Sequence, residues 1–275
     1  MKACAAQIRV EDGIENKEKN ASKVFEYVLK ASERGCDLVV FPECLLGGFK
    51  DTNEVSEPLE GPFITRLKEL SESHDIIIAG SFAESYKGRT FDTAFIIYKD
   101  FVGAYRKNIL FTPGGEHKIF SPGLSKPRVF EIKGRKIGML ICYELRFPEL
   151  TLPLLKEGVE ILIIPAARMA PRRVSDREAL IPARAVELQS YVIAVNRVGG
   201  KFFGRSAIAG PSGEVYRAGR NEGLYVAEID KERIYETRSK IPAAETRKKL
   251  FEVLTNREAL IRASRSPAVS SAGGI

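Results

Sequence analysis

Short apolar runs alternate with helix-like stretches along this 275-residue chain. Residues 3–10 form the first apolar run, and residues 16–34 repeat apolar side chains about every 3.6 positions, as one face of a helix does. Residues 38–41 are a second apolar run, rich in β-branched side chains and closed by Pro42. This pattern predicts a strand, a helix and a second, buried strand at the start of the fold.

The alternation continues to the end of the chain. Helices are predicted at residues 62–73, 148–157, 175–189 and 231–238, and strands at residues 75–82, 91–98, 102–105, 129–132, 136–142, 161–164, 191–196, 206–209 and 224–229. Apolar strands between helices indicate sheets covered by helices, while the consecutive strands in the middle indicate antiparallel neighbours. A layered α/β sandwich satisfies both conditions.

Composition and charge narrow the class of protein. Hydrophobic residues at 44% and charged residues at 29% are typical of an ordinary globular protein. The net charge of +7 comes from Lys and Arg residues spread among nearly as many carboxylates, so we expect no nucleic-acid partner. No apolar run reaches the roughly 18 residues of a membrane helix, and the N-terminus lacks a signal-peptide pattern. We therefore expect no membrane partner and a cytoplasmic location.

Chain length predicts one large domain over residues 1–262, because a chain of this size buries roughly 75% of its surface around one core. Residues 263–275 are rich in Ser, Ala and Gly, and we expect a tail that is flexible or ordered at a subunit interface. Cysteines at positions 4, 36, 44 and 142 contain no C-x-x-C pair. We expect four free thiols and no zinc site.

Three reactive side chains, Glu43, Lys107 and Cys142, follow predicted strands, whose carboxyl ends face a shared cleft. A nucleophilic thiol needs a base to take its proton and donors to stabilise the oxyanion that follows attack. Neither His74 nor His117 lies in a context like that of a Cys-His protease. Glu43 is the candidate base, and we expect its buried, apolar surroundings to raise its pKa toward neutrality.

The segments around these residues carry a resemblance to a known family. V-V-F-P-E-C at Glu43, Y-R-K-N at Lys107 and G-M-L-I-C-Y-E-L-R-F-P at Cys142 resemble, in order and spacing, the three signatures of the nitrilase superfamily of carbon–nitrogen hydrolases. The likeness covers roughly residues 2–240 and includes A-R-A-V-E-L-Q-S-Y-V-I-A-V-N-R-V-G. It implies a four-layer α-β-β-α sandwich that uses no cofactor and no metal.

The resemblance also implies roles for individual residues. Cys142 is the expected nucleophile, Glu43 the general base and Lys107 the cation that stabilises the intermediate. The backbone N–H of Tyr143 is the expected second oxyanion donor, and Glu116 occupies the place of a second glutamate that orients the lysine and the substrate. The implied reaction converts a small amide to a carboxylic acid and ammonia through a thioester on Cys142.

The loop after the P-A-A segment departs from many relatives, because Arg168, Arg172 and Arg173 stand where an aromatic residue is common. We hypothesise that one of these arginines binds a carboxylate, which favours an ω-amide of a dicarboxylic acid as substrate. A solvated basic loop is the competing interpretation.

Other functions remain open from the sequence alone. Within enzymes, the alternatives are an N-carbamoyl amino acid hydrolase and a nitrilase, which use the same three side chains. An alternative of another class is a non-catalytic basic binding protein on the same fold. The resemblance further implies a homodimer or larger homo-oligomer, with the helix after Cys142 and the helix at residues 175–189 at the interface.

Overall fold

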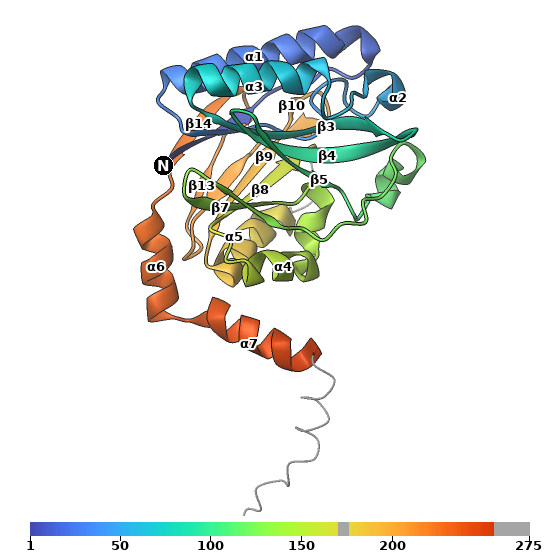
Figure 1. The fold of residues 1–275 in the computed structure, drawn as a ribbon. Helices are drawn as coiled ribbons and strands as arrows, with labels where there is room; N and C mark the ends of the chain where they lie inside the picture. The colour runs from blue at the N-terminus through green and yellow to red at the C-terminus, as the bar shows by residue number, and fades with distance from the viewer. Residues whose placement is uncertain (170–175, 256–275) are drawn as a thin grey trace, which may run out of the picture.

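The computed structural model describes residues 1–169 and 176–255 (Figure 1). The strands are β1 (Lys2–Gln7), β2 (Leu38–Val40), β3 (Ile77–Tyr86), β4 (Arg89–Tyr98), β5 (Phe101–Arg106), β6 (Val129–Ile132), β7 (Arg135–Met139), β8 (Ile161–Ala166), β9 (Tyr191–Asn196), β10 (Val198–Gly199), β11 (Phe202–Phe203), β12 (Ala207–Ala209), β13 (Val215–Arg217) and β14 (Gly223–Glu228). The α-helices are α1 (Lys17–Glu33), α2 (Thr52–Val55), α3 (Pro62–His74), α4 (Thr151–Lys156), α5 (Asp176–Leu188), α6 (Lys231–Lys240) and α7 (Ala243–Thr255). Short 3₁₀ helices are η1 (Ile14–Asn16), η2 (Thr112–Gly114), η3 (Glu116–Lys118), η4 (Cys142–Arg146) and η5 (Pro148–Leu150).

Two six-stranded sheets form the centre of the molecule. Their strand orders are β14-β1-β2-β3-β4-β5 and β13-β12-β9-β8-β7-β6. Helices α1 and α3 cover the outer face of the first sheet, and α4 and α5 cover the outer face of the second (Figure 1). The predicted α-β-β-α sandwich is confirmed.

Each sheet combines parallel and antiparallel pairs, as the sequence predicts. Strands β1, β2 and β3 run parallel, and so do β7, β8 and β9, while β3, β4 and β5 form an antiparallel meander. The turn between β6 and β7 places Lys133 and Gly134 at φ values of 49° and 67°, the left-handed pair that a tight two-residue hairpin requires. Parallel pairing brings the carboxyl ends of β2 and β8 to loops where polar side chains meet.

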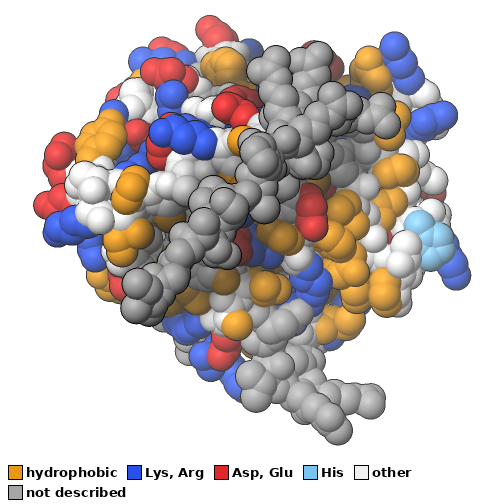
Figure 2. All heavy atoms as spheres, turned by 90° about the horizontal axis from the view of Figure 1, so that it is seen from below, with side chains coloured by type: hydrophobic (Ala, Val, Ile, Leu, Met, Phe, Trp, Pro, Cys, Tyr) orange, Lys and Arg blue, Asp and Glu red, His pale blue; other side chains and the backbone are white. Residues whose placement is uncertain are grey.

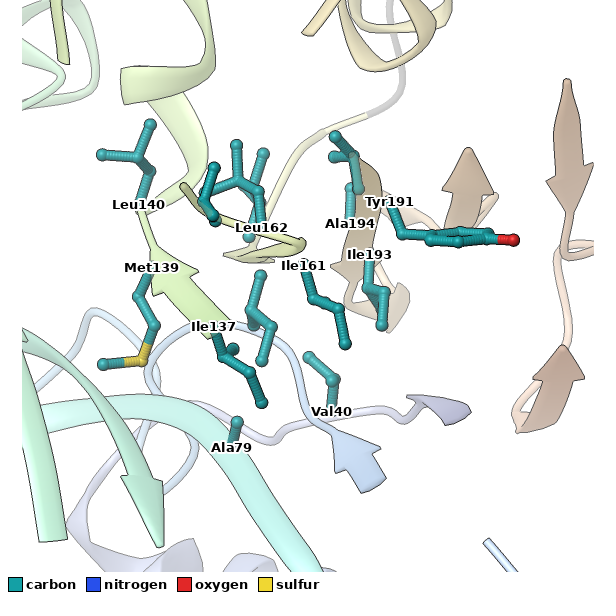
Figure 3. Packing of buried hydrophobic residues seen from close by; sticks show 14 of the residues in the cluster. Val40, Ala79, Ile137, Met139, Leu140, Ile161, Leu162, Tyr191, Ile193 and Ala194 are labelled. Carbon is teal, nitrogen blue, oxygen red and sulfur yellow. The ribbon is translucent and has the colours of Figure 1, made fainter. Parts of the chain in front are cut away.

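The main core lies between the two sheets. Val40 and Ala79 of the first sheet approach Ile137, Ile161 and their neighbours in the second (Figure 3). All of these side chains are buried, and fully burying one aliphatic side chain stabilises the fold by about 1.5–3 kcal/mol. A separate apolar cluster lies under α1 and α3 on the other face of the first sheet.

Several boundaries differ from the predictions. Strand β1 ends at Gln7 because the backbone of the next residue bonds elsewhere. The Ile8 carbonyl accepts a hydrogen bond from Val198 N instead of from a strand of the first sheet. Strand β3 begins at Ile77 because Asp75, in the left-handed conformation, ends helix α3. Elements α2, α7, β10, β11 and β13 were not predicted. Four of them are only two to four residues long, and α7 is a longer helix that the sequence analysis missed.

The prediction of four free thiols is wrong. Cys4 in β1 and Cys36, just before β2, form a disulfide beneath α1, and both side chains are buried. Cys44 and Cys142 are free, as predicted. The sequence pattern missed the disulfide because the two cysteines are 32 positions apart and meet only when β1 pairs with β2.

No helix within the described ranges combines the length and apolar character needed to cross a bilayer. The cytoplasmic location stays a prediction. The expected tail at residues 263–275 and the domain boundary at residue 262 lie outside the described residues.

Candidate active site

Glu43 lies in the loop after β2 and is held there from the opposite sheet. Its backbone N–H donates to the Ala166 carbonyl at the end of β8, at 3.3 Å. Its own carbonyl accepts a hydrogen bond from Arg197 Nε at 2.7 Å, and Arg197 also donates to the carbonyl of Cys44. Glu43 and Arg197 are both fully buried. These contacts fix the Glu43 loop against the second sheet.

Lys107 follows β5 and points its ammonium into a group of carboxylates. Its Nζ lies 2.7 Å from Glu43 Oε1, 2.8 Å from Glu116 Oε2 and 3.5 Å from Asp92 Oδ2. The side chain is fully buried. Burial opposes the charged form, but the attraction of Glu43 and the other acidic groups around it holds the pKa of Lys107 well above its usual value. Lys107 therefore stays a cation.

Glu116 is the first residue of η3 and reaches back toward the lysine. Its Oε1 accepts a hydrogen bond from Lys107 Nζ at 2.9 Å, while its Oε2 accepts one from Phe111 N at 2.7 Å. Burial and the nearby charge of Glu43 raise the pKa of Glu116 above its usual value. Glu116 is thus fixed at both carboxylate oxygens.

Cys142 begins η4 immediately after residues 137–141, a run without polar side chains that starts in β7. Its φ of 44° is left-handed, a conformation that costs a non-glycine residue about 1–3 kcal/mol. The Glu43 carboxylate and the backbone N–H of Ala167 are near enough to the thiol to shift its pKa, in opposite directions. Burial, followed by the charge of Glu43, raises the pKa of Cys142 to about 12. At neutral pH the cysteine is therefore a thiol beside a base.

The expectation that burial raises the pKa of Glu43 is wrong. Burial does act in that direction and is the largest single effect. The Lys107 charge, together with hydrogen bonds from Asp92, Lys107 and Cys142, outweighs it and lowers the pKa below the usual value. Glu43 is therefore ionised at neutral pH and able to accept a proton.

Glu144 joins the Cys142 segment to the Lys107 segment. Its Oε1 accepts hydrogen bonds from Tyr105 Oη at 2.8 Å and Asn108 N at 2.8 Å, and its Oε2 accepts one from Ile141 N at 2.9 Å. Burial raises the pKa of Glu144 above its usual value. Because these contacts flank both reactive residues, Glu144 sets the distance between them.

A cavity of about 350 Å³ opens above Cys142. Its lining includes the aromatic residues Phe49, Phe111, Tyr143 and Phe202, the cations Arg146, Arg168 and Lys201, and the reactive residues Glu116 and Cys142. The predicted site residues Arg172 and Arg173 lie outside the described residues. The structure thus brings together Glu43, Lys107, Glu116 and Cys142, with Tyr143 and Arg168 on the cavity wall.

The sequence did not single out Asp92, Arg197 or Lys201, and it placed Glu144 in the Cys142 signature without a role in the site. Asp92 had a signal, since it is an acidic residue inside the mostly buried strand β4. Arg197 follows the apolar strand β9 and gives a weaker signal of the same kind. Lys201 gives none, because a lysine after two glycines is also typical of an exposed turn.

A second cavity, of about 370 Å³, lies at the β13–β14 edge of the two sheets, and its lining contains no cysteine or carboxylate. Residues 1–169 and 176–255 contain no group of three or more His, Cys, Asp or Glu side chains placed to hold a metal ion. The carboxylates of Glu43, Asp92 and Glu116 surround the Lys107 ammonium instead.

The fold is a two-sheet sandwich, and its site combines a cysteine on the cavity wall with a buried glutamate–lysine pair. These features are typical of α/β enzymes that use a thiol nucleophile. The family model described as carbon-nitrogen hydrolase matches residues 2–239, so the chain belongs to the carbon–nitrogen hydrolase family.

Similar proteins agree with this assignment. The chain is 34% identical over 204 residues to an (R)-stereoselective amidase of Pseudomonas sp, covering 70% of this chain and 73% of the relative. It is 34% identical over 230 residues to the 2-oxoglutaramate amidase of Bacillus subtilis (strain 168), covering 80% and 88%. The fold is similar to that of a CN-hydrolase superfamily protein of Xanthomonas campestris, with a TM-score of 0.80, 23% identity and coverage of 90% and 96%. The predicted amidase-type carbon–nitrogen hydrolase is confirmed.

Proposed function

We propose that this enzyme hydrolyses small linear amides with Cys142 as nucleophile, Glu43 as general base and Lys107 as the cation that stabilises the intermediate. The observation that supports this proposal is that three distant segments meet: Glu43 Oε1 lies 2.7 Å from Lys107 Nζ, and the Cys142 thiol is near enough for both charges to shift its pKa. A thiol beside an ionised base and a cation is a starting state from which the nucleophilic thiolate can form.

In the first half-reaction, Glu43 takes the thiol proton while the Cys142 sulfur attacks the amide carbon. The oxyanion that forms receives hydrogen bonds from Lys107 Nζ and the backbone N–H of Tyr143, at the start of η4. Removing one such donor typically lowers kcat by about 10²–10³-fold. The tetrahedral intermediate collapses to a thioester as Glu43 returns the proton to the departing ammonia.

In the second half-reaction, a water molecule gives a proton to Glu43 and adds to the thioester carbon. Collapse of that intermediate breaks the carbon–sulfur bond, releases the carboxylic acid and returns the proton from Glu43 to the Cys142 sulfur. One base thus serves both steps. Glu116 holds the Lys107 ammonium in position throughout, through its two-oxygen contact.

We further propose that the substrate carries a carboxylate at the end opposite to the amide, as in an ω-amide of a dicarboxylic acid. Arg168 and Lys201 line the cavity with Arg146, while Phe49, Phe111 and Phe202 supply apolar walls for a short carbon chain. Cationic side chains bind carboxylates through charge-assisted hydrogen bonds. The similarity to a 2-oxoglutaramate amidase agrees with this substrate class.

Ammonia release from a panel of compounds tests the proposed reaction. The panel contains ω-amides of dicarboxylic acids, neutral aliphatic amides of the same chain length, nitriles and N-carbamoyl amino acids, with Cys142→Ala as the inactive control. We expect hydrolysis of amides, and a higher kcat/KM for the ω-amides. Turnover of nitriles or carbamoyl amino acids alone would overturn the amide assignment. A preference for neutral amides would overturn the proposal that the substrate carries a carboxylate.

Substitutions at the cavity wall test the carboxylate-binding residues. Arg168→Ala and Lys201→Ala are expected to raise KM for an ω-amide roughly tenfold or more, since a hydrogen bond to a charged group contributes about 1.5–3 kcal/mol. KM for the neutral amide should change far less. Lys118→Ala is the matched control, because Lys118 is exposed on η3 and does not line the cavity. Equal effects on both substrates would contradict a role in carboxylate binding.

We also propose that the enzyme assembles into a homo-oligomer through the face that carries α4 and α5. Figure 2 shows hydrophobic side chains gathered on the face seen from below. Val186 on α5 is 48% exposed, and Leu250 on α7, which packs against α4 and α5, is 55% exposed. Clustered exposed apolar residues are typical of subunit interfaces. A monomer mass in light scattering at micromolar concentration would contradict this assembly.

A further inference from the structure

Three buried carboxylates share the Lys107 ammonium. Every ion pair that the described residues make to Glu43, Asp92 or Glu116 goes to Lys107 Nζ. The Glu43 and Asp92 side chains are at most 1% exposed, and that of Glu116 is 8% exposed. With Cys142 as a thiol, three ionised carboxylates would leave this cluster with two excess negative charges. Such a charge is costly to bury even with the Arg197 guanidinium against the Glu43 and Cys44 carbonyls, so burial favours an additional proton on the cluster.

The hydrogen bonds around Asp92 show where that proton belongs. Asp92 Oδ1 accepts a hydrogen bond from Ser81 Oγ at 2.8 Å. Asp92 Oδ2 and Glu43 Oε2 are both buried, and neither receives a hydrogen bond from a donor in the described part of the chain. Both groups nevertheless lie against the same ammonium, with Lys107 Nζ 2.7 Å from Glu43 Oε1 and 3.5 Å from Asp92 Oδ2, and each shifts the pKa of the other. Two carboxyl groups can bond to each other only if one of them carries a proton.

We propose that Asp92 is a protonated carboxylic acid that donates a hydrogen bond from Oδ2 to Glu43 Oε2 and thereby positions the general base. The bond leaves Glu43 ionised, with Oε1 facing Lys107 and Oε2 facing Asp92. Asp92 does not line the substrate cavity, so it acts through Glu43 and is a positioning residue. This inference rests on the proposed role of Glu43 as the base.

The charged surroundings agree with this placement of the proton. Asp92 is faced by Glu43 from the loop after β2, Lys107 from the end of β5, Glu116 from η3 and the Cys44 thiol. Burial, followed by the charge of Glu43, raises the pKa of Asp92 well above its usual value, although Lys107 opposes the shift. The pKa of Glu43 is lowered in the same cluster. The raised pKa of Asp92 and the lowered pKa of Glu43 both favour a neutral Asp92 beside an ionised Glu43.

Two substitutions of Asp92 distinguish a neutral hydrogen-bond donor from a negatively charged carboxylate at this position. Asp92→Asn keeps a neutral side chain whose Nδ2 can donate to Glu43 and whose oxygen can accept from Ser81. Asp92→Leu removes the donor. We expect Asp92→Leu to lower kcat on the order of 100-fold with little change in KM, and to move the acid limb of the pH profile to higher pH. Asp92→Asn should recover activity to within about tenfold of the wild type and keep the acid limb in place.

An ionised Asp92 predicts a different result for the same two variants. If Asp92 acts as an ion, Asp92→Asn removes a negative charge beside Glu43. Activity would then fall as far as in Asp92→Leu, and the acid limb would move to lower pH. That outcome would overturn the inference.

Infrared difference spectroscopy of the resting enzyme tests the proton without using activity. The spectrum of wild type minus Asp92→Asn should contain the C=O stretch of a protonated carboxyl group at neutral pH. Asp100→Asn is the matched control, because the Asp100 side chain is fully exposed, and it should show only a carboxylate band. Absence of the protonated band overturns the inference even if Asp92→Leu fails to fold. If the band is present in an enzyme that hydrolyses no amide, the proposed function fails and the proton assignment stands.

Discussion

The guanidinium of Arg197 donates a hydrogen bond from Nε to the backbone carbonyl of Glu43 at 2.7 Å. Arg197 directly follows β9 in the second sheet, whereas Glu43 follows β2 in the first. The contact therefore ties the two sheets together at the residue proposed to act as the base. Arg197 is fully buried, and its Nη2 also donates to the carbonyl of Cys44.

Arg197→Met is expected to lower both stability and kcat, because it leaves two buried carbonyls without this donor and frees the Glu43 loop. The free energy of unfolding in urea should fall by at least about 2 kcal/mol. Arg66→Met is the control, since Arg66 forms an exposed pair with Glu69 and should change stability by less than about 1 kcal/mol. Equal losses of unfolding free energy in the two variants would show that the Arg197 contact stabilises the fold no more than an exposed ion pair does.

The dependence of kcat/KM on pH follows from the ionisation of Glu43. A base must be deprotonated to act, and the pKa of Glu43 is lowered, so activity should be lost only as pH falls below the usual carboxyl value of about 4.3. The profile should then stay level through neutral pH, because the pKa of Cys142 is raised to about 12 and Lys107 stays protonated. An acid limb near pH 6 to 7 would instead support the raised pKa that the sequence predicted.

Alkylation of Cys142 by iodoacetamide reports on the same base without an amide substrate. Glu43→Gln removes the proton acceptor beside a thiol whose pKa is raised to about 12. We expect the rate of alkylation at neutral pH to fall by at least about tenfold. Peptide mass spectrometry must separate Cys142 from the other free thiol, Cys44, which is buried. An unchanged rate would show that Glu43 does not take the Cys142 proton.

Glu116→Gln tests whether orientation of the lysine matters for catalysis. The amide can still accept a hydrogen bond from Phe111 N, but it loses the ionic contact with Lys107 Nζ. We expect kcat to fall on the order of 100-fold while the protein stays folded, because a small displacement of the cation is costly in the transition state. His117→Gln, at the exposed neighbouring position, should retain the wild-type rate. A wild-type kcat in both variants would show that Glu116 has no role in catalysis.

The disulfide between Cys4 and Cys36 is expected to stabilise the fold without affecting the reaction. Closing a loop between residues 32 positions apart contributes about 3–4 kcal/mol in the chain-entropy description. Dithiothreitol should therefore lower the urea midpoint of the wild type but not that of the C4A/C36A double variant. Both proteins should keep similar kcat values, since the disulfide lies under α1 and outside the substrate cavity. A midpoint insensitive to reductant would contradict the stabilising role.

Local sequence was enough to predict most of the fold. The strands at Val129–Ile132 and Tyr191–Asn196 match their predicted bounds, because each is a short run rich in apolar residues whose strand preference agrees with burial between neighbours. The tight turn at Lys133 and Gly134 also has a local cause, since few residue pairs tolerate two left-handed conformations. Elements with a weak local signal, such as β13, form only because a neighbouring strand is already in place.

The sequence by itself determined the α/β sandwich and the family, and it singled out the side chains proposed to react, because hydrophobic period and reactive side-chain type are properties of neighbouring positions. Only the tertiary structure decided the direction of the Glu43 pKa, the disulfide and the position of Asp92 beside Lys107. Each depends on charges or atoms that come from segments far apart in the chain and meet in the buried interior. Electrostatic energy is set by those distances and by burial, and neither can be read from the order of residues.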